Sequence, residues 1–149
     1  MKKPLVMSAE QSPKPLNVGG FDIAVLASVE QTGGYELFRM SGPEGTGPGP
    51  HHHAWDESFF VLTGALHCGV DGIDTLATAG TLIHVPGGTT HWFKFASGGG
   101  EIFTITSAGN ASKMFEAFHK GINWADPDRR ALVELAASYG QTVVTEPQS

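Results

Sequence analysis

The sequence is poor in cysteine and in positive charge, and it has no long apolar run. Its single cysteine, Cys68, rules out a disulfide within the chain and fits a reducing compartment, so we expect a cytoplasmic protein. Nine Lys and Arg stand against fifteen Asp and Glu, a net charge of −6, and the basic residues form no cluster. Nucleic acid and anionic membranes are therefore poor partners, because both require a concentrated positive surface.

Apolar stretches are also too short for a membrane-spanning segment. None approaches the roughly 18 residues that a spanning helix needs, and the apolar run near the N-terminus ends before Ser8, which is too short for a signal peptide. The sequence therefore predicts a soluble protein.

Glycine and proline, by contrast, are abundant, with 20 and 9 residues in a chain of 149. This composition is typical of many short strands joined by tight turns rather than of a helical bundle. A chain of this length forms one domain that buries about two thirds of its unfolded surface. All-β is the expected fold class.

Alternating apolar residues predict the strands. Residues 21–29 and 35–40 read as a hairpin joined at Gly33-Gly34, and residues 58–70 as a strand-rich stretch broken near Thr63-Gly64. Four further short strands are predicted at 73–76, 82–85, 91–95 and 102–106. About eight strands separated by glycine-rich turns predict a double-sheet jelly-roll β-barrel.

After Gly109 the apolar period changes from two to about 3.6. One helix is expected from Asn110 to Gly121, and a second from an Asp126 cap and Pro127 to Gly140. Both are expected to pack against the outside of the barrel and to have no other role. The predicted organisation is an N-terminal arm, a barrel and a helical extension: 1–15, 16–109 and 110–149.

The most informative stretch carries His51, His53 and Glu57. In an extended chain these positions share one face, so two imidazoles and a carboxylate point the same way. His91, which follows a second strand and the turn at 86–88, can supply a fourth ligand of the same kind. The pattern predicts a metal site.

The spacing of these residues resembles the two motifs of the cupin superfamily. The first, G-x5-H-x-H-x3-E-x6-G, is filled by Gly45, His51, His53, Glu57 and Gly64. The second, G-x5-P-x-G-x2-H-x3-N, is filled by Gly80, Pro86, Gly88 and His91, with Phe95 in place of the final Asn. The order of segments is similar to small single-domain quercetin-dioxygenase-like cupins. That resemblance implies a jelly-roll barrel, a homodimer, and a metal held by the three histidines and Glu57.

Three nitrogens and one carboxylate oxygen suit a borderline divalent transition metal. Iron is our first choice, with manganese, nickel, copper, cobalt and zinc as alternatives. Calcium and magnesium prefer oxygen ligands and are disfavoured. The four side chains could instead survive only as markers of the fold, without a metal.

Strand alternation predicts an aromatic, apolar pocket around the metal, and no inward Lys or Arg is apparent. The expected lining residues are Phe59, Val61, Phe93, Phe95 and Phe103, although some of them could simply fill the barrel. His84 is either a proton shuttle in the cavity or a histidine satisfied by the backbone, and His52 is expected to face away from the metal.

These features favour a metal-dependent dioxygenase that acts on a small aromatic or apolar compound. Glu57 is the expected base for the substrate proton and His84 a second catalytic candidate. Two other interpretations stay open: a non-catalytic module that binds a metal and a small ligand, and an isomerase or lyase that uses the metal as a Lewis acid.

Overall fold

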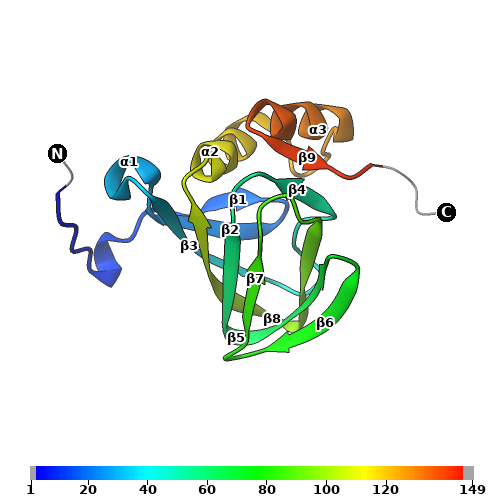
Figure 1. Cartoon of the computed structure of the whole chain (residues 1–149), viewed down its shortest axis with the longest axis horizontal. Coiled ribbons are helices and arrows are strands. Elements are labelled where there is room, and N and C mark those ends of the chain that lie inside the picture. The colour runs from blue at the N-terminus through cyan, green and yellow to red at the C-terminus, as the bar shows by residue number, and fades with distance from the viewer. Residues whose placement is uncertain (1–2, 146–149) are drawn as a thin grey trace.

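The computed structural model describes residues 3–145. The strands and helices in chain order (Figure 1) are a 3-10 turn Ala9–Gln11, β1 Leu16–Val18, β2 Phe21–Ala27, α1 Val29–Thr32, β3 Tyr35–Gly42, β4 His51–His53, β5 Glu57–Val70, β6 Ile73–Thr78, β7 Leu82–Val85, β8 His91–Ser107, α2 Ala111–Gly121, α3 Arg129–Ser138 and β9 Gln141–Val143. Within these residues, no helix is both long and apolar enough to cross a membrane.

Two long strands, β5 and β8, pair with each other along most of their lengths and belong to both faces of the barrel. One face has the order β1-β2-β3-β8-β5-β7, and the other has β6-β5-β8-β4-β9. All pairs are antiparallel, and the curled sheet encloses a core of large apolar side chains such as Phe38, Leu66 and Ile102. This architecture confirms the all-β jelly-roll barrel with C-terminal helices.

Glycines allow β5 and β8 to bend while they stay paired with each other on both sides of the bend. Gly64 has φ 70°, and a Cβ there would lie 2.1 Å from the carbonyl oxygen of Gly99 on the adjacent strand. Each long strand had been expected as two short ones, because a glycine inside a strand pattern reads as a break. The bend also changes which positions of β8 point inward. Phe93 and Phe95 are buried before the bend, and Ile102 is buried after it.

The connection between β2 and β3 is longer than the predicted turn. A one-turn helix, α1, occupies Val29–Thr32 and ends at Gly33, which has the left-handed φ of 76°. The predicted strand over 21–29 therefore ends at Ala27.

The C-terminal segment covers one end of the barrel, where Figure 1 shows α2, α3 and β9 above β4 and β1. Helix α2 has the bounds that the sequence predicts. Helix α3 begins later than expected, because the side chain of Asp128 rather than Asp126 caps it by accepting a hydrogen bond from the Ala131 N–H. Strand β9 was not predicted, and it pairs with β4.

One buried carboxylate ties this covering segment to the barrel. Glu36 on β3 is fully buried and accepts hydrogen bonds from the Ser112 N–H (2.9 Å) and hydroxyl (2.5 Å) and from the Val29 N–H (3.0 Å). These groups lie in the first turns of α2 and α1, where backbone N–H groups have no partner within the helix. Glu36 thus anchors two helices at once.

Candidate metal centre

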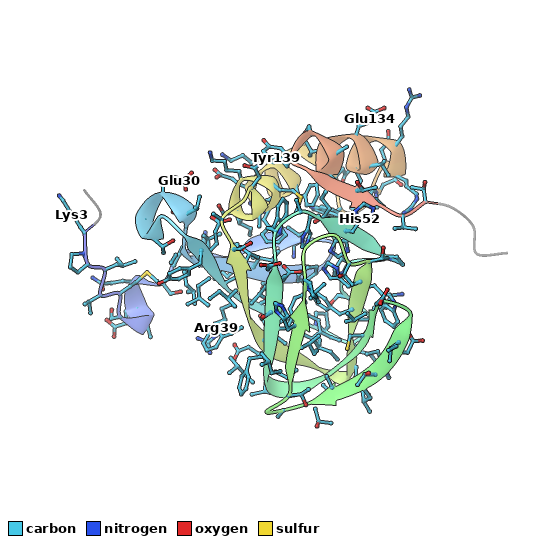
Figure 2. The ribbon with its side chains drawn as sticks, viewed as in Figure 1. Lys3, Glu30, Arg39, His52, Glu134 and Tyr139 are labelled. Atoms are coloured by element: carbon cyan, nitrogen blue, oxygen red, sulfur yellow. The ribbon has the colours of Figure 1, made fainter. Side chains whose placement is uncertain are left out.

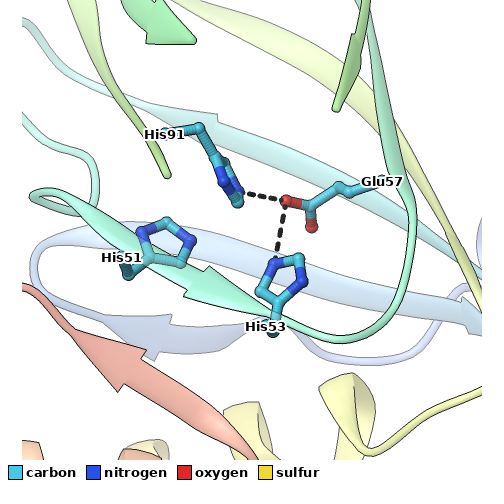
Figure 3. A group of neighbouring side chains, drawn as sticks. All are labelled: His51, His53, Glu57 and His91. Atoms are coloured by element: carbon cyan, nitrogen blue, oxygen red, sulfur yellow. Dashed lines mark hydrogen bonds and ion pairs between the residues drawn. The ribbon is translucent and has the colours of Figure 1, made fainter. Parts of the chain in front are cut away.

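Four side chains from three strands converge at the covered end of the barrel (Figure 3). They are His51 and His53 on β4, Glu57 at the start of β5 and His91 at the start of β8. One nitrogen or oxygen from each lies within 4.8 Å of the others, and all four residues are buried. The pairing of His51 with His91 across β4 and β8 brings the two motifs of the sequence together.

The backbone orients each imidazole. His51 Nδ1 lies 2.8 Å from the Gly49 carbonyl oxygen, His53 Nδ1 2.9 Å from that of Trp55, and His91 Nδ1 2.8 Å from that of Thr89. A carbonyl oxygen only accepts hydrogen bonds, so each Nδ1 must donate. The second nitrogen, Nε2, therefore carries the lone pair in a neutral ring, which is the form that binds a metal.

Glu57 faces two of these nitrogens. Its Oε1 lies 3.0 Å from Nε2 of His91 and 3.5 Å from Nε2 of His53 (dashed lines, Figure 3). A carboxylate oxygen and a neutral Nε2 both accept, so the arrangement requires a shared proton or another cation between them. The donor set fits a divalent transition metal, which would satisfy all four groups at once.

The surroundings also favour the metal-binding forms of two ligands. Burial, aided by the charge of neighbouring His91, lowers the pKa of His51 from 6.5 to about 4, so this ring is neutral at pH 7. Burial alone would raise the pKa of Glu57, but hydrogen bonds and charge from His53 and His91 outweigh it and lower the pKa to about 2. The site therefore offers an ionised carboxylate at neutral pH.

A cavity of about 250 Å³ opens between this cluster and the C-terminal segment. Its floor includes His51, His53 and Glu57, and Trp55 stacks on His53 with ring centroids 4.3 Å apart. Apolar side chains from α2 and α3 form its cover: Met114, Phe115, Phe118 and Leu132. The helices were expected only to pack on the outside, but they close the mouth of the barrel.

Comparison with known proteins agrees with this geometry. Residues 38–105 match the Cupin domain family (Cupin_2), a segment that contains all four clustered residues. This segment of the chain therefore forms a cupin domain. No curated protein sequence matches it.

Solved cupin-like structures resemble the whole barrel. An RmlC-like cupin from Shewanella frigidimarina has 21% identity, a TM-score of 0.63 and coverage of 76% of this chain and 99% of its own. A predicted oxalate decarboxylase from Thermotoga maritima has 19% identity, a TM-score of 0.63 and coverage of 69% and 98%. The polyketide cyclase RemF from Streptomyces resistomycificus has 16% identity, a TM-score of 0.60 and coverage of 72% and 80%. At these identities the likeness concerns the fold.

Two of the five predicted pocket residues line the cavity. Phe59 and Phe93 belong to its wall. Val61 and Phe95 are buried farther along the same strands, and the Phe95 ring packs against Phe21 and Phe93 in the core. Val61 and Phe95 therefore fill the barrel, which was the alternative interpretation of the predicted pocket residues.

Phe103 lies on the outer surface of the barrel, so its assignment to the pocket was wrong. Its ring packs under the guanidinium group of Arg39 at 5.9 Å, and Figure 2 shows Arg39 on the outside of the barrel. The bend near Gly99 shifts the alternation of β8 by one residue, so Ile102 and Thr104 point inward in its place.

His84 is exposed and does not reach the cavity, so the proton-shuttle role was also wrong. Its Nδ1 lies 2.8 Å from the Ser58 hydroxyl on the outer face of β5. His84 and Leu82 are two residues apart on β7, so their side chains point to the same face. Leu82 is 64% exposed, and this face is therefore the outer one. His52 faces away from the cluster, as expected from its position between two ligands.

Sequence reasoning missed two polar residues of the cavity, Arg129 and Gln141. It had found no inward Lys or Arg, whereas Arg129 lies at the rim because α3 begins there. Gln141 enters because β9 pairs with β4 and sets it opposite His53. The run of β-favouring residues after Tyr139-Gly140 was the available signal for this strand.

Proposed function

We propose that this cupin is a metal-dependent oxygenase acting on a small aromatic or apolar compound. The observation that carries the proposal is the set of three backbone-oriented Nε2 atoms and one carboxylate at the floor of a mainly apolar cavity. A divalent transition metal, with iron as the first candidate, would supply a redox-active Lewis acid at this point.

The protein's own residues would bind and orient the substrate and accept its proton. Phe59 and Phe93 contribute aromatic rings to the apolar wall of the cavity, and the cover formed by α2 and α3 excludes water. Glu57 would accept the substrate proton at Oε2, the oxygen that does not face the imidazoles in Figure 3. The substrate would donate this proton from a hydroxyl group such as a phenol or an enol.

Elemental analysis tests the metal directly. Wild-type protein purified without added metal or chelator should contain about one equivalent of iron, manganese, nickel, copper, cobalt or zinc, and His91→Ala should contain almost none. His84→Ala is the matched control, because His84 is an exposed histidine outside the cluster. Absence of metal from the wild type, with none taken up on reconstitution, would contradict the proposal.

Oxygen consumption tests the reaction. Protein with bound metal should consume oxygen in the presence of small phenols, and Glu57→Gln should slow turnover even in samples matched for metal content. Full turnover by Glu57→Gln would show that Glu57 is not the base. Binding of phenols without any chemical change would instead favour the non-catalytic module.

A second candidate is an isomerase, lyase or cyclase that uses the metal only as a Lewis acid. The structural similarity to a predicted oxalate decarboxylase and to a polyketide cyclase favours it. Turnover under strict anaerobic conditions would support this candidate over the oxygenase. A zinc-only site would shift the balance in the same direction, because zinc has no redox chemistry.

A cytoplasmic homodimer completes the proposal. The outer face of β5, β7 and β8 exposes Phe60, Leu82 and Ile105, which are 43%, 64% and 42% accessible in the single chain. An apolar face of this kind supports association of two copies. Sedimentation equilibrium should give twice the chain mass, and Leu82→Glu should shift the protein toward the monomer.

A further inference from the structure

The size of the cavity limits the substrate to about one ring. Its volume is about 250 Å³, whereas pockets for drug-sized ligands run from about 300 to 1,000 Å³ and a cavity of about 150 Å³ accommodates benzene. One substituted ring fits within this space. The cavity therefore selects for small ring compounds.

Gln141 provides a neutral hydrogen-bonding group next to the metal ligands. It is 8% exposed and lines the cavity, and its pairing opposite His53 directs both side chains to the same face. No hydrogen bond to its side-chain amide is found within residues 3–145. The residue borders the open space of the cavity, where a hydroxyl or carbonyl oxygen on a ligand would form a hydrogen bond with the amide.

Arg129 provides a positive charge at the outer end of the same cavity. It is the first residue of α3 and lines the rim, yet the side chain is exposed to solvent. Its neighbour Arg130 is paired with Glu134, with Nε and Oε1 3.0 Å apart, and Figure 2 shows Glu134 on the side of α3 away from the barrel. No such pair involves Arg129 in the described part of the chain, so its charge remains available to an anionic ligand.

From these three features we infer the substrate class: a one-ring compound with a hydroxyl or carbonyl oxygen at its inner end and an anionic group at its outer end. Gln141 recognises the inner oxygen and Arg129 pairs with the anion. The inference rests on the proposed function, because the inner oxygen lies beside the metal ligands. It makes Gln141 and Arg129 specificity-determining residues of the cover.

Three probes separate the two contacts: 4-hydroxybenzoate, benzoate, which lacks the hydroxyl, and 4-methylphenol, which lacks the anion. Dissociation constants are measured by titration calorimetry under argon on protein with its metal bound, so that binding is read without turnover. We expect wild type to bind 4-hydroxybenzoate more tightly than either of the other two. Failure to bind any of the three would overturn the inference.

The Gln141 contact is tested by Gln141→Leu, which keeps the volume and removes the amide. It should weaken 4-hydroxybenzoate and 4-methylphenol about fivefold, as expected for one neutral hydrogen bond, and leave benzoate unchanged. Thr142→Val is the matched control, because Thr142 is exposed on the opposite face of β9. Metal content and melting temperature, measured in parallel, identify a variant that has merely misfolded.

The Arg129 contact is tested by Arg129→Gln, with Arg130→Gln as the control. Arg129→Gln should weaken 4-hydroxybenzoate and benzoate about threefold, the size expected for a solvent-exposed charge pair, and leave 4-methylphenol unchanged. The difference should shrink at high salt. Equal benzoate binding by Arg129→Gln and wild type, with binding lost on metal removal, would place the carboxylate on the metal and overturn the inference.

The substrate class and the oxygenase proposal can fail separately. Binding that depends on both residues without oxygen consumption would keep the substrate class and reject the oxygenase. Oxygen consumption with aromatic substrates whose KM is the same in wild type, Gln141→Leu and Arg129→Gln would keep the oxygenase and overturn the substrate class.

Discussion

The floor and the cover of the cavity are built in different ways. The floor belongs to the cluster of four candidate ligands, His51, His53, Glu57 and His91. Strand alternation positions these side chains, and each imidazole forms a hydrogen bond with a carbonyl two residues away in the chain. The cover, residues 111–143, is positioned by contacts with distant strands. Chemistry at the floor is thus encoded locally, whereas selectivity depends on how the C-terminal segment docks.

This contrast predicts that the cover can be loosened through a residue far from the metal. Glu36→Ala leaves the buried N–H and hydroxyl of Ser112 and the partly buried N–H of Val29 without their acceptor. We expect a loss of about 3 to 5 kcal/mol in the free energy of unfolding, measured by urea denaturation.

Glu30→Ala is the control for this change, because Glu30 forms only an exposed pair with Lys113 and should cost little. Equal stability of the two variants would mean that the cover does not depend on Glu36. The distinction between a locally built floor and a distantly anchored cover would then fail.

The floor should instead respond to acid. Burial lowers the pKa of His51 to about 4 in the folded protein, so between pH 6.5 and 4 the unfolded chain binds a proton that the folded chain does not. The free energy of unfolding of metal-depleted protein should therefore fall as the pH drops through this range. The His51 contribution amounts to about 3 kcal/mol, at about 1.4 kcal/mol per unit.

Urea denaturation at pH 7, 5.5 and 4.5 measures this slope, and His51→Gln should flatten it. Other groups titrate in the same range, so the comparison between wild type and variant carries the prediction. Identical slopes would show that the ring of His51 is not held neutral by burial.

Filling the cavity from the cover should separate binding from metal retention. Leu132 on α3 lines the cavity, and the carbonyls that orient the histidines belong to other residues. Leu132→Trp should weaken 4-hydroxybenzoate more than about tenfold by occupying the ligand volume, with the metal content unchanged. Loss of metal together with binding would mean that floor and cover form one unit.

The smallest effect is expected at Cys68, which is buried and lies outside the cavity. Burial, aided by Asp74, raises the pKa of its thiol. Iodoacetamide should therefore modify Cys68 at least about tenfold more slowly than free cysteine at pH 8. Rapid modification would indicate that β5 and β6 open readily at this end of the barrel.

Much of the floor could be predicted because its ligands follow from spacing. Residues 51, 53 and 57 share a face of extended chain, and His91 follows the turn at 86–88. The pocket was predicted less well, because the alternation shifts at the bend near Gly99 and the inward face of residues 102–106 does not follow from that of residues 91–95. Phe103 was placed inside for that reason, and His84 because its parity was assigned without the pairing of β7 to β5.

The sequence alone therefore determined the barrel, the helix α2 and the four candidate ligands, since each depends on residues close together in the chain or on periodicity. Only the tertiary structure decided that α2 and α3 close the barrel, that Glu36 anchors them, and that Gln141 lies opposite His53. These contacts join residues 76 and 88 positions apart. No local spacing rule reaches that far, because such pairs form only when the C-terminal segment packs on the completed barrel.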